Sequence, residues 1–331
     1  MTGRLRFDAV AVLSASDHPA LRYFVRRDLL GEAVEPVSVL WDTAEAARIV
    51  ARQQLDGRWR YPGGDPAIRS RANYDQLETY RQLGVLVYKF GFTRRHPAIE
   101  RAAQFLAGYQ TESGDYRGIY GNQYTPNYSA AITELLIRAG YARSPQVAAT
   151  MRWLRTVRQD DGGWAIPTRT RGMPLLSMLA AADTIEPDRT RPSAHLVTGI
   201  VLRAFAAHPA HRLSALTHRA GVLLKSRFFS RDRYPDHVAA SYWTIFSYPF
   251  WWTDLLSALD CLTLARFDAT DPDIAQALTW FIDHQQPNGL WNTGRNRPKD
   301  PYSDLWVALA VCRMLNRIQQ PLDTGPGHAA L

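Results

Sequence analysis

The chain has 331 residues, 46% of them hydrophobic, which excludes a disordered chain and predicts a globular protein with one large core or two ordinary ones. Its formal net charge is +8, but it contains no long run of Lys or Arg, so no nucleic-acid partner is expected. Lys occurs only at positions 89, 225 and 299, so almost all the basic residues are Arg. This bias reflects either a GC-rich genome or an anionic partner, because the guanidinium group binds carboxylate and phosphate through paired hydrogen bonds.

Helical periodicity and helix-boundary residues predict an all-α chain without strands. The expected helices cover residues 17–31, 43–54, 74–90, 97–110, 126–140, 145–159, 192–208, 212–225, 250–265, 272–286 and 302–317, with a short apolar piece at 175–182. We expect residues 1–320 to form a single domain. Residues 321–331, which are rich in Pro, Gly and Ala, are expected to form a flexible tail.

Two features bear on the compartment of the protein. Cys261 and Cys312 both lie in apolar helical patterns, which predicts buried free thiols and favours a reducing compartment. The apolar run 9–13 is too short for the core of a signal peptide, and no apolar run of 18 residues follows it. A cytoplasmic protein without a transmembrane segment is therefore expected, and peripheral contact with a membrane stays open.

A short motif recurs along the chain and sets its organisation. The clearest copy, QDDGGW at residues 159–164, has close relatives at 54–59 and 286–291 and a looser one with Tyr at 110–116. Each copy ends one predicted helix and opens a loop that leads to a second, more apolar helix. Five such helix pairs follow an N-terminal helix, and pairs stacked in sequence form either an open solenoid or a closed ring.

This Q-x-x-D-G-x-W pattern resembles the repeat of the terpenoid cyclase and protein prenyltransferase superfamily. The sequences of residues 118–124 and 250–256 resemble a divergent branch with the prenyltransferase and squalene oxidase repeat. The resemblance implies a closed (α/α) toroid of five or six helix pairs, with outer helices that end in Gln and inner helices that line a central cavity. Gln and Trp would then be structural, because the amide satisfies open backbone groups and the indole packs over the joint. Asp160 and Asp161 become loop or capping groups rather than catalysts.

The chain also departs from that superfamily. It has no D-x-D-D string, which class II terpene cyclases use as their acid. The zinc ligands of protein prenyltransferases are absent too, since Ser303 follows Tyr302 and Cys261 directly follows Asp260. We therefore predict no metal and no cofactor.

Polar and aromatic groups recur near the starts of the predicted inner helices, where they would face the cavity. We expect Asp254 to act as the proton donor, with Asp75 and Asp304 next, although carboxylates at helix starts also serve as caps. Further catalytic candidates are Glu78, His195, Tyr128 and Tyr302, and His195 can equally be a satisfied core residue. Candidate binding residues are Tyr74, Asn127, Glu134, Trp251, Trp252 and Trp306.

Basic residues cluster at corresponding places in three loops. They are Arg69 and Arg71, Arg169 and Arg171, and Arg295, Arg297 and Lys299. These side chains form either a solvated surface with local ion pairs or one cationic rim that captures a phosphate, diphosphate or carboxylate.

These sequence features are compatible with three functions. The first is an enzyme on an isoprenoid or other apolar-tailed anionic substrate, with acid-initiated carbocation chemistry stabilised by aromatic rings. The second is a polysaccharide lyase or glycoside hydrolase on an acidic glycan, since (α/α) toroids also host these enzymes. There Tyr, His and Asn groups would act on the sugar while the Arg loops held its carboxylates. The third is a non-catalytic binding or scaffold toroid, which a filled centre would favour.

Overall fold

The protein is described by a computed structural model that places residues 5–294 and 300–319. Within these residues all regular secondary structure is helical, apart from two isolated β-bridges, as the sequence predicts. The expected tail at 321–331 lies outside the described residues, so the domain limits stay a prediction.

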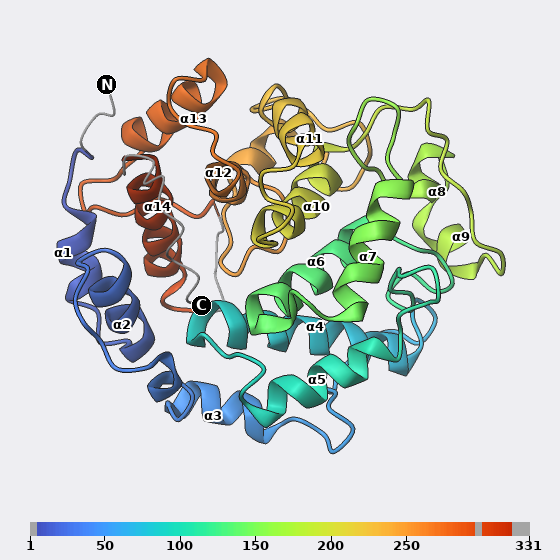
Figure 1. Ribbon diagram of the computed structural model, residues 1–331, viewed down its shortest axis with the longest axis horizontal. Coiled ribbons are helices and arrows are strands. Elements are labelled where there is room, and N and C mark those ends of the chain that lie inside the picture. Colours follow the sequence, from blue (N-terminus) through green and yellow to red (C-terminus); the bar gives the residue numbers. More distant parts are fainter. Residues whose placement is uncertain (1–4, 295–299, 320–331) are drawn as a thin grey trace.

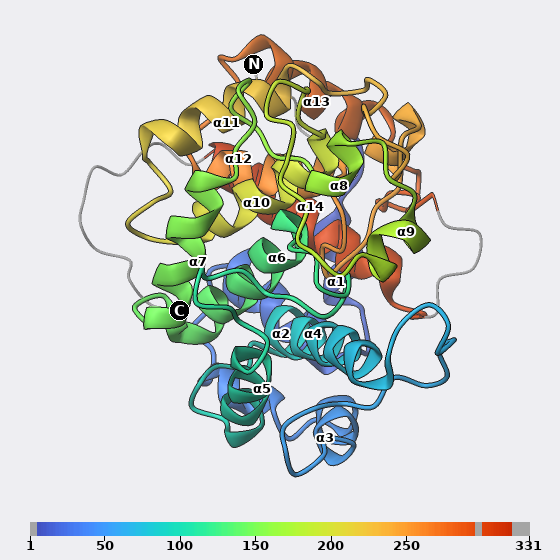
Figure 2. The ribbon, with the colours of Figure 1, turned by 90° about the vertical axis from the view of Figure 1, so that its right-hand side faces the viewer.

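Outer and inner helices alternate along the chain (Figure 1). The outer helices are α1 (Ala9–Ser14), α3 (Ala44–Ala51), α5 (Pro97–Ala107), α7 (Pro145–Thr156), α11 (Ala215–Lys225) and α13 (Pro272–Asp283). The inner helices are α2 (Pro19–Asp28), α4 (Arg71–Phe90), α6 (Pro126–Leu136), α10 (His195–Ala207), α12 (Leu255–Leu264) and α14 (Ser303–Gln319). Short segments at Val37–Leu40, Ile137–Tyr141 and Ala240–Thr244 form 3-10 or π turns. The connection from α7 to α10 carries two small helices, α8 (Pro167–Thr170) and α9 (Leu175–Ala180), which face the viewer in Figure 2.

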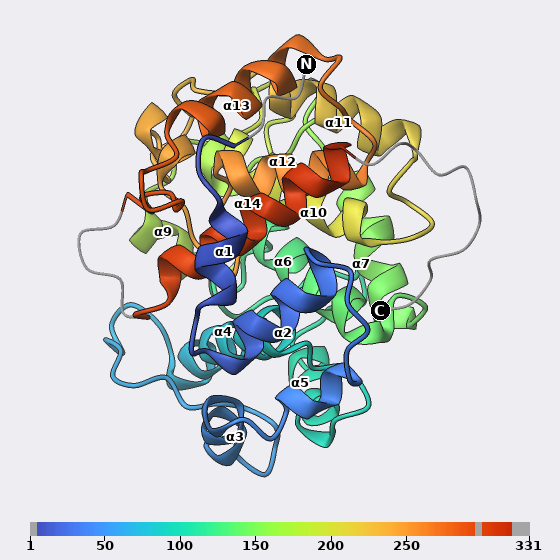
Figure 3. The same cartoon turned by 90° about the vertical axis from the view of Figure 1, so that its left-hand side faces the viewer.

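The inner helices form a closed ring. Contacts run from α2 to α4, then to α6, α10, α12 and α14, and α14 packs back on α2. Each of α5, α7 and α11 packs on the inner helix before it, and α1 packs on α14 in the same way (Figure 3). The structure is therefore the predicted toroid rather than an open solenoid.

Helix α1 is not among the helices that the sequence predicts. The side chain of Asp8 accepts a hydrogen bond from the Ala11 N–H at 3.1 Å and starts the helix. Ala9 and Leu13 bury against the core. The helix is stable because it packs on α14 and α2, since six residues are too few for an isolated helix. This extra helix makes six outer–inner pairs in the described chain instead of five and an unpaired helix.

The motif tryptophans occupy equivalent places at the joints, as predicted. Trp59, Trp164 and Trp291 are each at most 3% exposed. Each donates its indole N–H, at 2.7 Å, to the carbonyl oxygen ten residues earlier in its own outer helix. The rings therefore lock the end of each outer helix to the loop that leaves it.

The register of the glutamines differs from the prediction by one residue at two joints. Gln54 and Gln286 were expected to satisfy the joint, but the amides that do so belong to Gln53 and Gln285. The amide of Gln53 donates to the loop carbonyl of the fourth residue on, and to a carbonyl in the first turn of α5. Gln110, the looser copy, makes the same two bonds to its loop and to the first turn of α7. The working pattern is thus Q-x-x-x-G-x-aromatic, and its amide clamps the start of the next outer helix.

The joint after α13 closes the ring. The amide of Gln285 donates to the Phe7 carbonyl at 2.9 Å, and its oxygen accepts the Phe7 N–H at 3.0 Å. Phe7 directly precedes the Asp8 cap of α1, so α1 stands where the next outer helix would stand. Segments 278 positions apart in the chain are joined by the contact that elsewhere joins neighbouring repeats.

At two joints, other contacts take the place of the glutamine clamp. Arg158 stands at the glutamine position of the joint after α7, and Gln159 instead donates to two carbonyls of the α8–α10 connection, at 2.7 and 2.8 Å. At the end of α11, Lys225 forms ion pairs with Asp271 and Asp273 at the start of α13. Both devices still tie one outer helix to the segment that follows it.

Candidate functional site

The interior of the ring is crossed by the segment 248–252, which leads into α12. The sequence placed these residues inside a helix, but α12 begins only at Leu255. Trp251 packs edge-on against Tyr80 of α4 at 5.6 Å, and Phe250 packs against Tyr88 of the same helix. Since α4 and α12 are opposite each other in the ring order, this segment spans the interior.

Tyr248 extends the aromatic contacts to α14. Its ring stacks on Trp306 with centroids 5.7 Å apart, and its hydroxyl donates to the Tyr88 carbonyl at 3.2 Å. Trp306 is fully buried, whereas Trp252 is half-buried and donates its indole N–H to the Ile245 carbonyl. The chain's own aromatic side chains therefore fill the centre, and we name residues 248–252 the aromatic segment.

A buried ion network holds the aromatic segment in place. Glu134 of α6 accepts hydrogen bonds from Tyr88, from Arg138 at 2.9 Å and from Arg203 of α10 at 3.2 Å. The two remaining Arg203 nitrogens each donate at 3.0 Å to carbonyls of the aromatic segment. Burial acts to raise the pKa of Glu134, but the two guanidiniums and the Tyr88 hydroxyl together hold that pKa below its ordinary value. Glu134, predicted to bind substrate, is thus an ionised structural partner.

Asp254 follows the aromatic segment and caps α12. Its Oδ1 accepts the Ser257 N–H at 2.7 Å, and the Ser257 hydroxyl accepts the Asp254 N–H in return, which forms a capping box. Its Oδ2 is buried without a hydrogen-bond partner among the described residues, although the Ser247 N–H is close enough to act on the carboxyl. Burial raises the pKa of Asp254 from 3.8 to about 7, against the Ser257 hydrogen bonds and the Arg203 charge. The group can therefore hold a proton near neutral pH.

His195 lies at the first residue of α10 and is 3% exposed. Its Nε2 lies 3.6 Å from Asp232, whose carboxylate also accepts two N–H groups at the start of the helix, and its ring packs on Trp243 at 4.5 Å. Burial lowers the pKa of His195 to about 4, although Asp232 opposes this. Nδ1 has no partner among the described residues. This arrangement is that of a neutral core histidine.

Three tyrosines pack together beside the interior aromatic groups. Tyr128 of α6 packs edge-on against Tyr80 at 5.9 Å and Tyr120 at 5.4 Å, and burial raises its pKa. The neighbouring Asn127 is buried, and its Oδ1 has no partner among the described residues. Tyr74 is instead engaged with its own loop, because its hydroxyl bonds the backbone of Asp65. The structure thus brings Tyr128 and Asn127 to the interior aromatic groups, but not Tyr74.

Three predicted carboxylates have structural or surface positions. Asp75 is buried, accepts the Tyr61 N–H at 2.9 Å and pairs with two arginines, so it fixes the loop before α4. Glu78 is 9% exposed and bonds Gln82 on its own helix. Asp304 is exposed on the first turn of α14. The expectation that Asp304 faces the interior is wrong, because α14 turns its apolar face, which includes Trp306, toward the core.

The arginines of the loops are mostly held by the chain itself. Arg169 forms a bidentate pair with Asp236 at 2.8 Å, and Arg69 donates to a backbone carbonyl at 2.7 Å. Both charges act on Tyr120, so these two arginines do lie near each other. Arg71 and Arg171 are exposed and bond backbone carbonyls of their own loops. The third group, Arg295, Arg297 and Lys299, lies outside the described residues.

Tyr302 lies away from the aromatic segment, at a cleft on the rim of the ring. Its ring packs edge-on against His18 at 4.8 Å, and a hydrogen bond donated to the Asp17 carboxylate raises the pKa of the Tyr302 hydroxyl. The cleft has a volume of about 670 Å³ and is lined by α2, α3, α4 and residues 300–302. A second cleft, beside Arg169 and Asp236, has a volume of only about 10 Å³.

Sequence reasoning missed several residues that organise the interior. Arg203 lies in an apolar helix with no charged neighbour in sequence, so no nearby residue indicates its pairing with Glu134. A lone Arg and a lone Glu inside two apolar helices were the available signal, because buried charges need each other. Cys261 and Cys312 are buried free thiols, as predicted. Among the described residues no three His, Cys, Asp or Glu side chains are grouped to hold a metal ion.

The family model of the squalene-hopene cyclase C-terminal domain matches residues 78–175, which run from α4 to α9 and include two of the joints. Over these residues the chain is similar to that domain, and the remainder of the chain lies outside the match. No curated protein matches the sequence.

Similar solved structures include the type II terpene cyclase MstE from Scytonema, at 14% identity and a TM-score of 0.40, over 84% of this chain and 97% of that one. A variant of MstE in complex with geranylgeranyl dihydroxybenzoate matches at 13% identity and a TM-score of 0.39, over 85% and 97%. A protein from Actinoplanes matches at 16% identity and a TM-score of 0.28, over 84% and 100%. No helix in the described part of the chain is long and apolar enough to cross a bilayer.

Proposed function

We propose that the protein is a terpene cyclase-like isomerase or lyase that starts carbocation chemistry by protonating an alkene of an isoprenoid substrate. The observation that carries this proposal is Asp254, a fully buried carboxyl group with a pKa of about 7 and one oxygen without a hydrogen-bond partner among the described residues. A protonated acid of this kind takes the place of the D-x-D-D acid that the sequence lacks.

The chemistry follows from the position of Asp254. Its Oδ2–H gives a proton to one carbon of a substrate double bond, whose electron pair forms the new C–H bond and leaves a cation on the other carbon. A second double bond then closes a ring, and loss of a proton from the last cation restores the acid. The faces of Tyr80, Tyr128 and Trp251 offer cation–π stabilisation to the positive charge along this path.

The aromatic segment sets the condition for access. Trp251 lies so close to α4 that a Cβ placed on Gly84 would be 2.8 Å from its ring. A prenyl chain therefore reaches Asp254 only when the aromatic segment moves off α4, or when the substrate is short enough to stay beside it. Trp251→Ala removes the indole ring that contacts α4 and is expected to raise turnover of longer prenyl chains.

Deuterium labelling tests the acid role. Prenyl diphosphates and prenylated phenols of different lengths are incubated in D2O, and the products are analysed by mass spectrometry. The expected result is a cyclised or isomerised product with one carbon-bound deuterium, which is lost in Asp254→Asn and retained in Asp304→Asn. Asp304 is the matched control because it is also a carboxylate at the start of an inner helix, but an exposed one. Full turnover by Asp254→Asn would refute the assignment.

A non-catalytic binding toroid is the second candidate, and the filled centre favours it. In that case prenyl ligands would bind or fail to bind without any turnover, and Trp251→Ala would change affinity alone. The arginines that could hold uronate carboxylates are largely paired with the chain, so no observation favours the glycan enzyme in the same way.

A further inference from the structure

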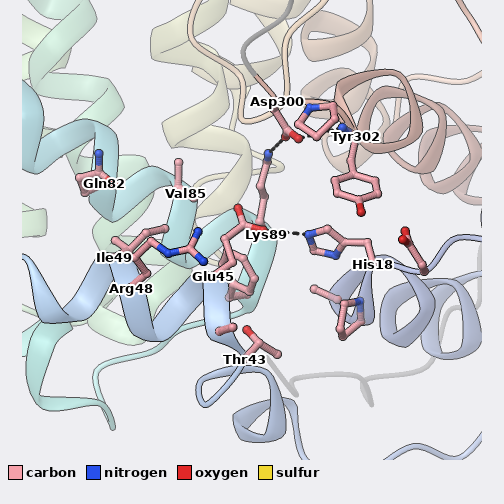
Figure 4. Close-up of a pocket in the computed structure, with 16 residues that line it drawn as sticks. His18, Thr43, Glu45, Arg48, Ile49, Gln82, Val85, Lys89, Asp300 and Tyr302 are labelled. Carbon is pink, nitrogen blue, oxygen red and sulfur yellow. Dashed lines mark hydrogen bonds and ion pairs between the residues drawn. The ribbon is translucent and has the colours of Figure 1, made fainter.

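The cleft at the rim of the ring, which we name the rim cleft, has features that the proposed cyclase chemistry does not use. It lies between the start of α2, the outer helix α3, the second half of α4 and residues 300–302, as Figure 4 shows. Its volume of about 670 Å³ is within the range of small-molecule sites. One wall is apolar and the opposite side is charged. The apolar wall is formed by Ile49, Val85 and Phe90.

The charged side has its basic groups inside and its acidic groups outside. The Lys89 side chain is 7% exposed and pairs with Asp300, which is 32% exposed. The His18 side chain is 5% exposed and its Nε2 lies 3.1 Å from Glu45, which is 44% exposed (Figure 4). In both pairs the basic group belongs to the floor of the cleft, and the carboxylate reaches it from the rim. A ligand anion can therefore replace either carboxylate, because the buried basic group then still has a negatively charged partner.

A third basic group in the rim cleft has no counterion. Arg48 is exposed on α3, reaches toward the space between the two pairs, and makes no hydrogen bond or ion pair with any described residue (Figure 4). By contrast, the cleft carboxylates Glu45, Asp300 and Asp17 all have partners: His18, Lys89 and Tyr302. The charged group of the rim cleft that is left without a partner is thus a hydrogen-bond donor.

We propose that the rim cleft binds a small organic anion, with a phosphate or carboxylate group held by Lys89 and Arg48 and an apolar part against Ile49 and Val85. The ligand oxygen displaces Asp300 from Lys89, and the released carboxylate turns to solvent. Arg48 then makes the charge-assisted hydrogen bonds for which it has no partner in the structure. This site is separate from Asp254 and does not depend on the proposed proton transfer.

Trp306 lies between the rim cleft and the interior. Trp306 has the Lys89 ammonium 5.2 Å from its ring on one side and Tyr248 of the aromatic segment stacked on it at 5.7 Å. When a ligand moves the Lys89 charge, the indole experiences a different field. Intrinsic fluorescence therefore offers a signal of binding, and Trp306→Phe identifies the part that arises at this site.

Titration calorimetry at fixed low salt tests the proposal with three probes: inorganic phosphate, inorganic diphosphate and citrate. Diphosphate as the tightest probe would point to a phosphorylated ligand, and citrate as the tightest probe to a carboxylated one. Arg48→Ala and Lys89→Gln are each expected to weaken the tightest probe about tenfold or more, as loss of a charge-assisted bond does. Arg52→Ala removes another exposed arginine, one turn further on at the C-terminal cap of α3 and outside the cleft, and is the matched control.

Glu45→Gln gives a result of the opposite sign. Removing a competing carboxylate is expected to tighten binding of the probe several-fold, whereas general attraction to a protein of positive net charge would change little. The proposal is overturned if no probe binds the wild-type protein at millimolar concentration. It is also overturned if Arg52→Ala weakens binding as much as Arg48→Ala, or if Lys89→Gln and Arg48→Ala both bind like the wild type.

Discussion

The raised pKa of Asp254 predicts a particular dependence of stability on pH. In the unfolded chain this carboxyl group ionises near pH 3.8, whereas in the folded protein its pKa is about 7. Between these values the folded state holds a proton that the unfolded state has lost, so the free energy of unfolding falls as pH rises. At about 1.4 kcal/mol for each pH unit, the loss from pH 4 to pH 7 is about 4 kcal/mol, and stability no longer changes from this source above pH 7.

Asp254→Asn isolates this effect, because the amide stays neutral and its oxygen can still accept the Ser257 N–H. Urea unfolding of both proteins from pH 4 to pH 8 is the assay, and the quantity of interest is the difference in unfolding free energy. All other titrating groups cancel in that difference. We expect the unfolding free energy of the variant, relative to that of the wild type, to increase by up to about 4 kcal/mol from the low to the high end of this pH range.

The same series with Asp304→Asn provides the control and is expected to give a difference that stays flat with pH, since that carboxylate is exposed. Parallel pH profiles for the wild type and Asp254→Asn would refute the reasoning. They would mean that Asp254 ionises in the folded protein as it does in the unfolded chain. The group would then be a simple helix cap, and the proposed acid role would lose its physical basis.

Three further results are expected from unfolding experiments. Gln53→Ala should cost about 1–3 kcal/mol because it leaves a joint open, while Gln54→Ala next to it should stay within about 0.5 kcal/mol; equal losses would contradict the corrected register. Glu134→Gln leaves the buried guanidinium of Arg203 without its counterion, whereas Arg138 keeps Asp260 at 3.7 Å. The change should cost about 3–5 kcal/mol, and a loss below about 1 kcal/mol would show that the network is not buried as described. Gly84→Ala should cost about 1–3 kcal/mol through overpacking against the aromatic segment; an unchanged midpoint and unchanged tryptophan fluorescence would show that this segment does not rest on α4.

The fold was predictable because its signals are local and repeated. Glycine, aromatic and glutamine residues recur at most of the joints, and the amphipathic helices between them have clear boundaries. The prediction is one residue off at Gln54 and Gln286 because two glutamines are adjacent in sequence at both the first and the last joint. Only the direction of each side chain distinguishes the buried amide of Gln285 from its neighbour.

The interior was less predictable because its contacts join distant helices. The sequence predicts a helix that begins at residue 250, since Phe250, Trp251 and Trp252 fit an apolar face. What decided its path was Arg203, which fixes two of its carbonyls from another helix. Likewise the acidic start of α14 looked like part of the cavity, yet Asp304 points to solvent while Trp306 takes the interior position.

The bond between Gln285 and Phe7 has a consequence for how the chain is made. A linear array of repeats can settle one repeat at a time as it leaves the ribosome, because each contacts only its neighbours. Here α1 and α2 bury their apolar faces on α14, which leaves the ribosome long after them. At about 5–20 residues per second, the first hairpin waits on the order of tens of seconds with that surface exposed. A nascent chain of this design has a built-in interval in which chaperone binding competes with aggregation.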